Sequence, residues 1–155
     1  MYNSNSLNQR NIIDLINNTK PDILALQEAD WIIGSSEINL PDFTTSYKGD
    51  ENPKNVKVIT YFDPSKFKFL DSYDGSDIAD KSIKKRGVIG LKLESLKNKN
   101  IVNIVNFHMA HYNVQENTNT IEQITELRRT LLQEYLNKLN YKPGEKIILC
   151  GDSNE

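Results

Sequence analysis

The sequence is poor in several features, and each scarcity excludes a class of protein. Cys150 is the single cysteine, so the chain has neither an internal disulfide nor a zinc site built from cysteines. No stretch reaches the roughly 18 consecutive apolar residues of a membrane-spanning helix. Residues 1–5 carry neither a basic region nor an apolar segment, so we expect no signal peptide. These absences favour a reducing compartment, and within the cell the cytoplasm.

An excess of positive charge is also missing. The chain has 19 Lys and Arg against 21 Asp and Glu, a net charge of −2. Its isoelectric point is near 5.7. No overall basic field attracts nucleic acid or an anionic membrane, so a nucleic-acid role would need a local patch. With 155 residues, 37% of them hydrophobic and 26% charged, the chain is long enough for one globular domain.

The apolar pattern predicts helices and strands in alternation. Helical periodicity places helices at residues 6–20 and 120–139. Short apolar runs predict strands at residues 22–26, 56–62, 67–70, 87–93, 101–107 and 146–150. Turn residues link the second and third of these strands, and the fourth and fifth, so we expect two hairpins. The order predicts an α/β fold, a mixed β-sheet with helices packed on it.

Polar side chains follow three of the predicted strands. Glu28 comes just after the first strand, His108 after the strand at 101–107, and Asp152 and Asn154 after the last. In layered α/β proteins, ligands collect beyond the strand ends. Carboxylate and amide oxygens suit a hard cation such as Mg²⁺, and a nearby imidazole can act as a general acid. These residues are therefore candidates for a phosphate-processing site.

Each candidate also has an ordinary structural interpretation. Acidic residues often cap helix starts or turns, which would account for Glu28 and Asp152. His108, taken alone, is typical of a hydrogen-bonded packing residue. The basic run that ends at Arg86 is typical of a solvated loop. None of these residues indicates a functional site singly; only several of them occurring in order do.

Four segments in order resemble the motifs of the endonuclease/exonuclease/phosphatase superfamily. Residues 21–28 (PDILALQE) resemble its "PD-(apolar)4-QE" segment, and residues 2–5 (YNSN) its asparagine-containing first motif. Residues 106–108 (NFH) resemble "N-x-H", and residues 151–154 (GDSN) resemble "GD-x-N". The resemblance spans essentially the whole chain and leans toward the deoxyribonuclease I branch. It implies a fold like the first half of a four-layer α/β/β/α sandwich.

The resemblance also implies a reaction and roles for single residues. The reaction is Mg²⁺-dependent attack of water on a phosphoester, with Mn²⁺ as an alternative ion. Glu28 would be a metal ligand, and Asn3 would lie near the metal. His108 would be a catalytic histidine, and Asp152 would orient or activate the water. The phosphate would be contacted by Asn154 and Arg86, whose guanidinium suits a phosphate.

The sequence departs from the superfamily pattern at both ends. Little of the family's first strand precedes Asn3, and its closing "S-D-H" motif, expected after "GD-x-N", has no counterpart here. We therefore expect a partial domain whose site is completed by a further C-terminal part or by a partner chain. Apolar surface that the missing strands would cover should be exposed. The 155 residues alone should be weakly active or inactive.

Three hypotheses follow from these observations. The first is a phosphodiesterase of the nuclease type. Its substrate would be a phosphoester, and nucleic acid is one candidate. The second is a sphingomyelinase or an inositol-phosphate phosphatase on the same fold. The acidic isoelectric point disfavours strong duplex binding, because that affinity depends on Lys and Arg contacts. The third is an inactive partial domain that serves as an interaction module.

Overall fold

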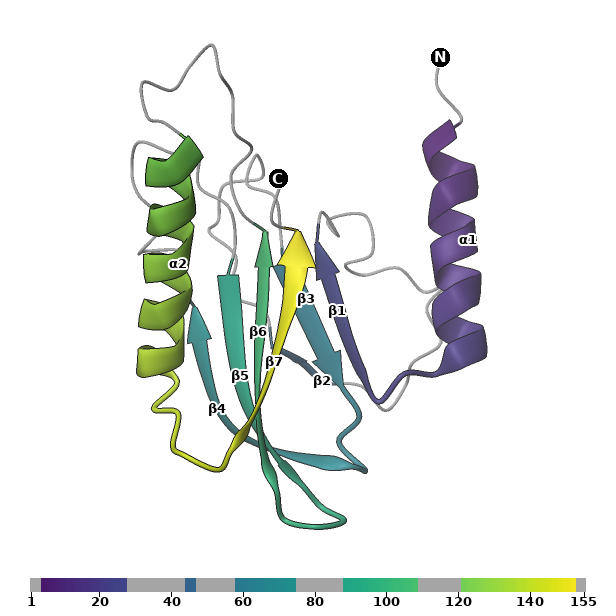
Figure 1. Ribbon diagram of the computed structural model, residues 1–155. Helices are drawn as coiled ribbons and strands as arrows, with labels where there is room; N and C mark the ends of the chain where they lie inside the picture. Colours follow the sequence, from purple (N-terminus) through teal and green to yellow (C-terminus); the bar gives the residue numbers. More distant parts are fainter. Residues whose placement is uncertain (1–3, 28–43, 47–57, 75–87, 109–120, 153–155) are drawn as a thin grey trace.

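The protein is described from a computed structural model that covers residues 4–27, 44–46, 58–74, 88–108 and 121–152 (Figure 1). The elements in chain order are α1 (Ser4–Thr19), β1 (Ile23–Gln27), β2 (Thr44–Ser46), β3 (Val58–Phe62), β4 (Phe67–Asp74), β5 (Val88–Ser95), β6 (Ile101–His108), α2 (Ile121–Lys138) and β7 (Lys146–Asp152). Both predicted helices and all six predicted strands are confirmed. Neither of the two described helices is long and apolar enough to cross a membrane.

The strands form two sheets. The smaller sheet has the order β1-β3-β2 and is antiparallel. The larger has the order β4-β5-β6-β7, in which β6 and β7 run parallel and the other pairs antiparallel. The parallel pair requires a long crossover, which contains α2. As a result, β6 and β7 end at the same edge of the larger sheet.

The apolar side chains divide the molecule into four layers. The two sheets face one another across a core that includes Phe62 of β3, Leu91 of β5 and Ile104 of β6. A second cluster packs α1 on the outer face of the smaller sheet. A third packs α2 on the outer face of the larger sheet through Leu132 and Leu136 of the helix and Leu139, which directly follows it. Figure 1 shows the two helices on opposite sides of the paired sheets. The predicted α/β/β/α arrangement is confirmed.

The predicted hairpin of residues 56–62 and 67–70 is wrong. These segments become β3 and β4, which lie in different sheets. Asp63 does form the expected turn, accepting a hydrogen bond from the backbone N–H of Ser65 at 2.8 Å. A turn of this kind can reverse the chain within one sheet or carry it to another, so turn chemistry alone does not decide pairing. β4 also continues to Asp74, through four residues predicted as loop. The hairpin of β5 and β6 is confirmed.

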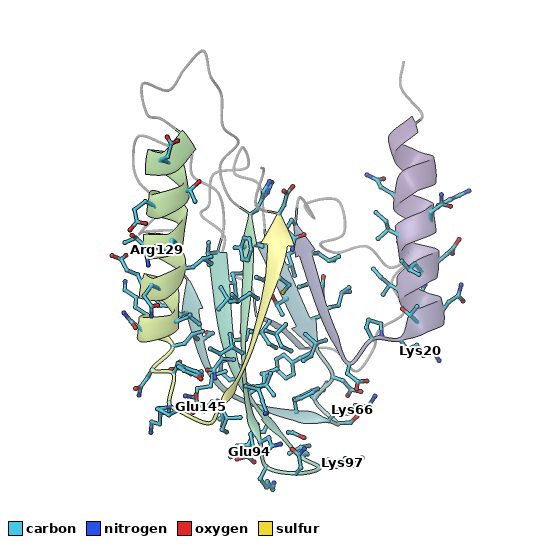
Figure 2. All side chains as sticks on the ribbon, viewed as in Figure 1. Lys20, Lys66, Glu94, Lys97, Arg129 and Glu145 are labelled. Atoms are coloured by element: carbon cyan, nitrogen blue, oxygen red, sulfur yellow. The ribbon has the colours of Figure 1, made fainter. Side chains whose placement is uncertain are left out.

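A polar cluster lies at the start of β7, at the opposite end of this strand from its arrowhead (Figure 2). Lys92 Nζ lies 2.9 Å from Glu145 Oε1, and the two side chains are only 12% and 11% exposed. Asn103 Nδ2 donates to Glu145 Oε2 at 2.9 Å and to Lys146 O at 3.2 Å. Burial would raise the pKa of the Glu145 carboxyl, but hydrogen bonds from Lys92 and Asn103 outweigh it and lower that pKa. The cluster fixes the start of β7.

β7 forms one edge of the larger sheet and carries apolar surface. Ile148 and Leu149 are 45% and 49% exposed, and they point to opposite faces of the strand. This edge strand of the described part therefore leaves two large apolar side chains accessible. That a further part of the chain or a partner chain covers them stays a prediction.

Candidate active site

The end of the parallel strand pair brings together two of the candidate residues. His108 and Asp152 are the last residues of β6 and β7 and are paired in the sheet register. His108 Nε2 lies 3.8 Å from Asp152 Oδ2. The imidazole is 1% exposed and the carboxylate 54% exposed. A buried imidazole therefore lies beside an exposed carboxylate, and side chains of these two types can take part in general acid–base chemistry.

Gly151 makes this approach of the strands possible. It pairs with Phe107, and a Cβ built at position 151 would lie 2.0 Å from the Phe107 carbonyl oxygen. Its φ of +155° is also a backbone angle that residues with a side chain rarely adopt. The glycine of the GD motif is therefore required by the close approach of β6 to β7 immediately before Asp152.

Asn106 makes hydrogen bonds to four other residues close to this edge. It is fully buried between the two sheets, two residues before His108. Its Nδ2 donates to the backbone oxygens of Ile59 at 2.9 Å and Leu26 at 3.2 Å. The same Nδ2 lies 3.1 Å from Thr60 Oγ1. One amide of the larger sheet thus holds both β1 and β3 of the smaller sheet.

Gln27 completes the connection between the sheets. As the last residue of β1 it donates from Nε2 to Asn106 Oδ1 at 2.6 Å. Both the oxygen and the nitrogen of the Asn106 amide are therefore used, which offsets the cost of burying it. Glu28, the predicted metal ligand, follows Gln27 directly in the sequence.

The other candidate residues lie outside the described part of the chain. These are Asn3, Glu28, Arg86 and Asn154. Within the described residues, no three or more His, Cys, Asp or Glu side chains cluster as a metal site would require. The roles predicted for all these residues, and for His108 and Asp152, stay predictions.

Asn106, Gln27 and Gly151 were not predicted as site residues from the sequence. Each lies inside one of the motifs, directly before or two residues before a candidate residue. That adjacency was the available signal. Their function in the fold follows from contacts between distant segments: Gln27 and Asn106 are 79 positions apart.

Solved structures share this architecture, although no family model and no curated protein sequence matches the chain. The catalytic domain of human Nocturnin with bound sulfate aligns at 20% identity and a TM-score of 0.72, over 96% of this chain and 57% of that one. TDP2 from D. rerio, complexed with a single-strand DNA product, aligns at 17% identity and 0.68, over 94% and 53%. A mannosyl-6-phosphatase from Bacteroides thetaiotaomicron aligns at 18% identity and 0.67, over 92% and 55%.

The chain has the endonuclease/exonuclease/phosphatase fold, the fold of these solved proteins. It spans little more than half the length of each of the three. One of these three solved proteins is a phosphatase by name, and TDP2 is complexed with a single-strand DNA product.

Proposed function

We propose that this chain carries half of the active site of a Mg²⁺-dependent phosphoesterase that hydrolyses phosphodiester bonds. The observation that carries the proposal is the pairing of His108 with Asp152 at the joint end of β6 and β7, at 3.8 Å. The fold shared with TDP2, which is complexed with a DNA product, and with a mannosyl-6-phosphatase supports it. So does the order of the sequence motifs in which these residues lie.

The two described residues divide the proton transfers between them. Asp152 accepts a proton from a water molecule as the water oxygen bonds to phosphorus. The bond from phosphorus to the leaving oxygen breaks, and a protonated His108 returns a proton to that oxygen. The exposed carboxylate can reach bulk water, and the buried imidazole is held against it. General acid–base catalysis of this kind contributes about 10²–10⁴-fold to a rate.

Glu28 and Asn3 are the residues proposed to hold the metal ion. Their carboxylate and amide oxygens are the ligands that Mg²⁺ prefers, so the donor set fits that ion. A bound ion would neutralise charge that develops on the phosphoryl oxygens. Arg86 and Asn154 are proposed to contact the phosphate, because a guanidinium and an amide both donate hydrogen bonds to phosphate oxygens.

The second candidate function is hydrolysis of a phosphomonoester. It is favoured by one observation, the shared fold of the mannosyl-6-phosphatase. The phosphodiester is preferred because TDP2, with the same fold, is complexed with a single-strand DNA product. The acidic isoelectric point of 5.7 favours single strands or small diesters over duplex DNA.

Hydrolysis assays test both candidates. Single-stranded DNA, bis(p-nitrophenyl) phosphate and p-nitrophenyl phosphate are each incubated with Mg²⁺ or with EDTA. The assay uses the 155-residue chain and the product of the reading frame extended to its stop codon. We expect the extended product to hydrolyse the diesters in Mg²⁺ and not in EDTA, and the Glu28→Gln variant to be inactive.

The outcomes separate the hypotheses. Hydrolysis of the monoester alone would replace the first candidate by the second. No hydrolysis by either protein would overturn both candidates. Self-association in sedimentation would then favour the interaction module, and a folded monomer would argue against it. Strong activity of the 155-residue chain alone would contradict the expectation that a further C-terminal part or a partner chain completes the site.

A further inference from the structure

We propose that Asn106 is a positioning residue that sets the spacing between the two halves of the site. One half is the end of β1, which leads into Glu28, and the other is the pair of His108 and Asp152. The inference rests on the proposed function, because it assigns Asn106 a part in presenting the metal ligand. It goes beyond that function because Asn106 is a buried residue that links the two sheets and is not among the residues proposed to hold the metal or the phosphate.

Position 106 holds an amide among apolar neighbours. Its neighbours on the same face of β6, Ile104 and Val102, pack in the apolar core between the sheets. An amide at this position is fully buried and would be costly if it were unpaired. The Asn106 amide donates from Nδ2 to Ile59 O and accepts at Oδ1 from Gln27, and neither leucine nor an ionised aspartate can do both.

The contacts of Asn106 lie at the end of β1. Asn106 binds the backbone of Leu26 and the side chain of Gln27, the last two residues of β1. The end of β1 is thus held at two points immediately before Glu28. On its own strand, Asn106 shares a face with His108, since residues two apart point the same way. A single side chain therefore couples the two strand ends that carry the candidate residues.

Asn103, on the same strand, resembles Asn106 in burial and in side-chain chemistry. Both asparagines are 0% exposed, and both amides donate to a backbone oxygen. Asn103 points to the other face and binds Glu145 and Lys146 at the start of β7. It contacts nothing in the smaller sheet among the hydrogen bonds of the described residues. Replacing Asn103 by leucine is thus a matched control for burial, strand and side-chain chemistry.

The experiment measures metal affinity and stability in parallel on the 155-residue chain. Binding of Mn²⁺ is followed by electron paramagnetic resonance without substrate, and unfolding by urea. The variants are Asn106→Leu, Asn103→Leu and Glu28→Gln. Gln27→Met is added because it removes the bond to Asn106 while keeping a side chain of similar size in case Asn106→Leu fails to fold.

We expect Asn106→Leu and Gln27→Met to weaken Mn²⁺ binding about tenfold, the lower range for residues that orient metal ligands. Asn103→Leu should lower the urea midpoint but keep the wild-type affinity. Wild-type affinity in folded Asn106→Leu or in Gln27→Met would overturn the inference. So would an equal loss in Asn103→Leu, because the effect would then be general destabilisation. If the wild type and Glu28→Gln bind Mn²⁺ equally, the proposed metal site itself is wrong, and the inference with it.

Discussion

The two buried asparagines of β6 show how differently one strand is used at its two ends. Asn103, near the start, binds outward to Glu145 and the first residue of β7, and so anchors a strand within its own sheet. Asn106, near the end, binds inward and joins the two sheets. The inter-sheet space is apolar over most of β6 and polar beside His108. Polar groups lie between the sheets where the candidate site begins. Apolar packing of the two sheets alone would not require them there.

The bonding of the two amides differs as well. The oxygen and nitrogen of Asn106 are both paired. Among the described residues, Asn103 Oδ1 is a buried atom that accepts no hydrogen bond. Removing the Asn103 amide therefore removes fewer bonds, and we expect the two ends of β6 to respond unequally to substitution.

The largest expected effect is on catalysis at the His108 end. Asp152→Asn and His108→Gln should each lower kcat for bis(p-nitrophenyl) phosphate by about 10²–10⁴-fold, because each removes one proton transfer. The measurement is steady-state hydrolysis by the extended reading-frame product, with Asn103→Leu as the control. Comparable loss of kcat in Asn103→Leu would break the contrast between the two ends of the strand.

The next largest effect is on stability where β6 meets β7. Gly151→Ala should lower the free energy of unfolding by about 3 kcal/mol, because its methyl group would overlap the Phe107 carbonyl. Gly144, in the turn before β7, has a φ of +93° and open space around it. Gly144→Ala should therefore cost only about 1 kcal/mol, from backbone strain. Urea unfolding of both variants tests this, and equal costs would show that the strands can separate.

A pH-dependent effect is expected at the Asn103 end. The folded state lowers the Glu145 pKa below its ordinary value of 4.5, so it stabilises the protein above that pH. This contribution is lost as the pH falls through the folded pKa. At pH 7, Glu145→Gln should be about 2 kcal/mol less stable, as for hydrogen bonds to charged groups. Urea unfolding at pH 7 and pH 3 should show the difference shrinking, and a difference that does not change with pH would contradict the ion pair.

The smallest effect concerns Cys150, which pairs with Asn106 in the sheet register. Burial raises the pKa of its thiol, and its Sγ lies 3.6 Å from Val105 O. At pH 7.5 a thiol reagent should therefore label it more slowly than it labels free cysteine. Asn106→Leu should speed the labelling a few-fold by loosening this edge, and Asn103→Leu should not. Equal labelling rates in Asn106→Leu and Asn103→Leu would contradict the expected difference between the two ends of β6.

The sequence predicted local structure better than pairing. The apolar stripe around Leu132 and Leu139 gave α2, and the NFH and GDSN segments located His108 and Asp152 at strand ends. Assignment of β3 and β4 to different sheets was missed, because their turn residues are compatible with either connection. The contacts of Asn106 with β1 were not predicted, because the residues next to it in the sequence do not indicate them. Hydrogen bonds between distant segments depend on the packed fold and leave no local periodicity.

The parallel pairing of β6 and β7 also has a consequence for the order of folding. The β5–β6 hairpin closes a short loop, whereas Cys150 and Val105 meet across 45 positions and Gln27 and Asn106 across 79. Closing longer loops costs more chain entropy, and non-local strand pairing is slow. His108 is therefore expected to be in place on its hairpin before Asp152 or the end of β1 reaches it. A partly folded chain would then have the β5–β6 hairpin formed, and the edge that carries the candidate residues would still be unassembled.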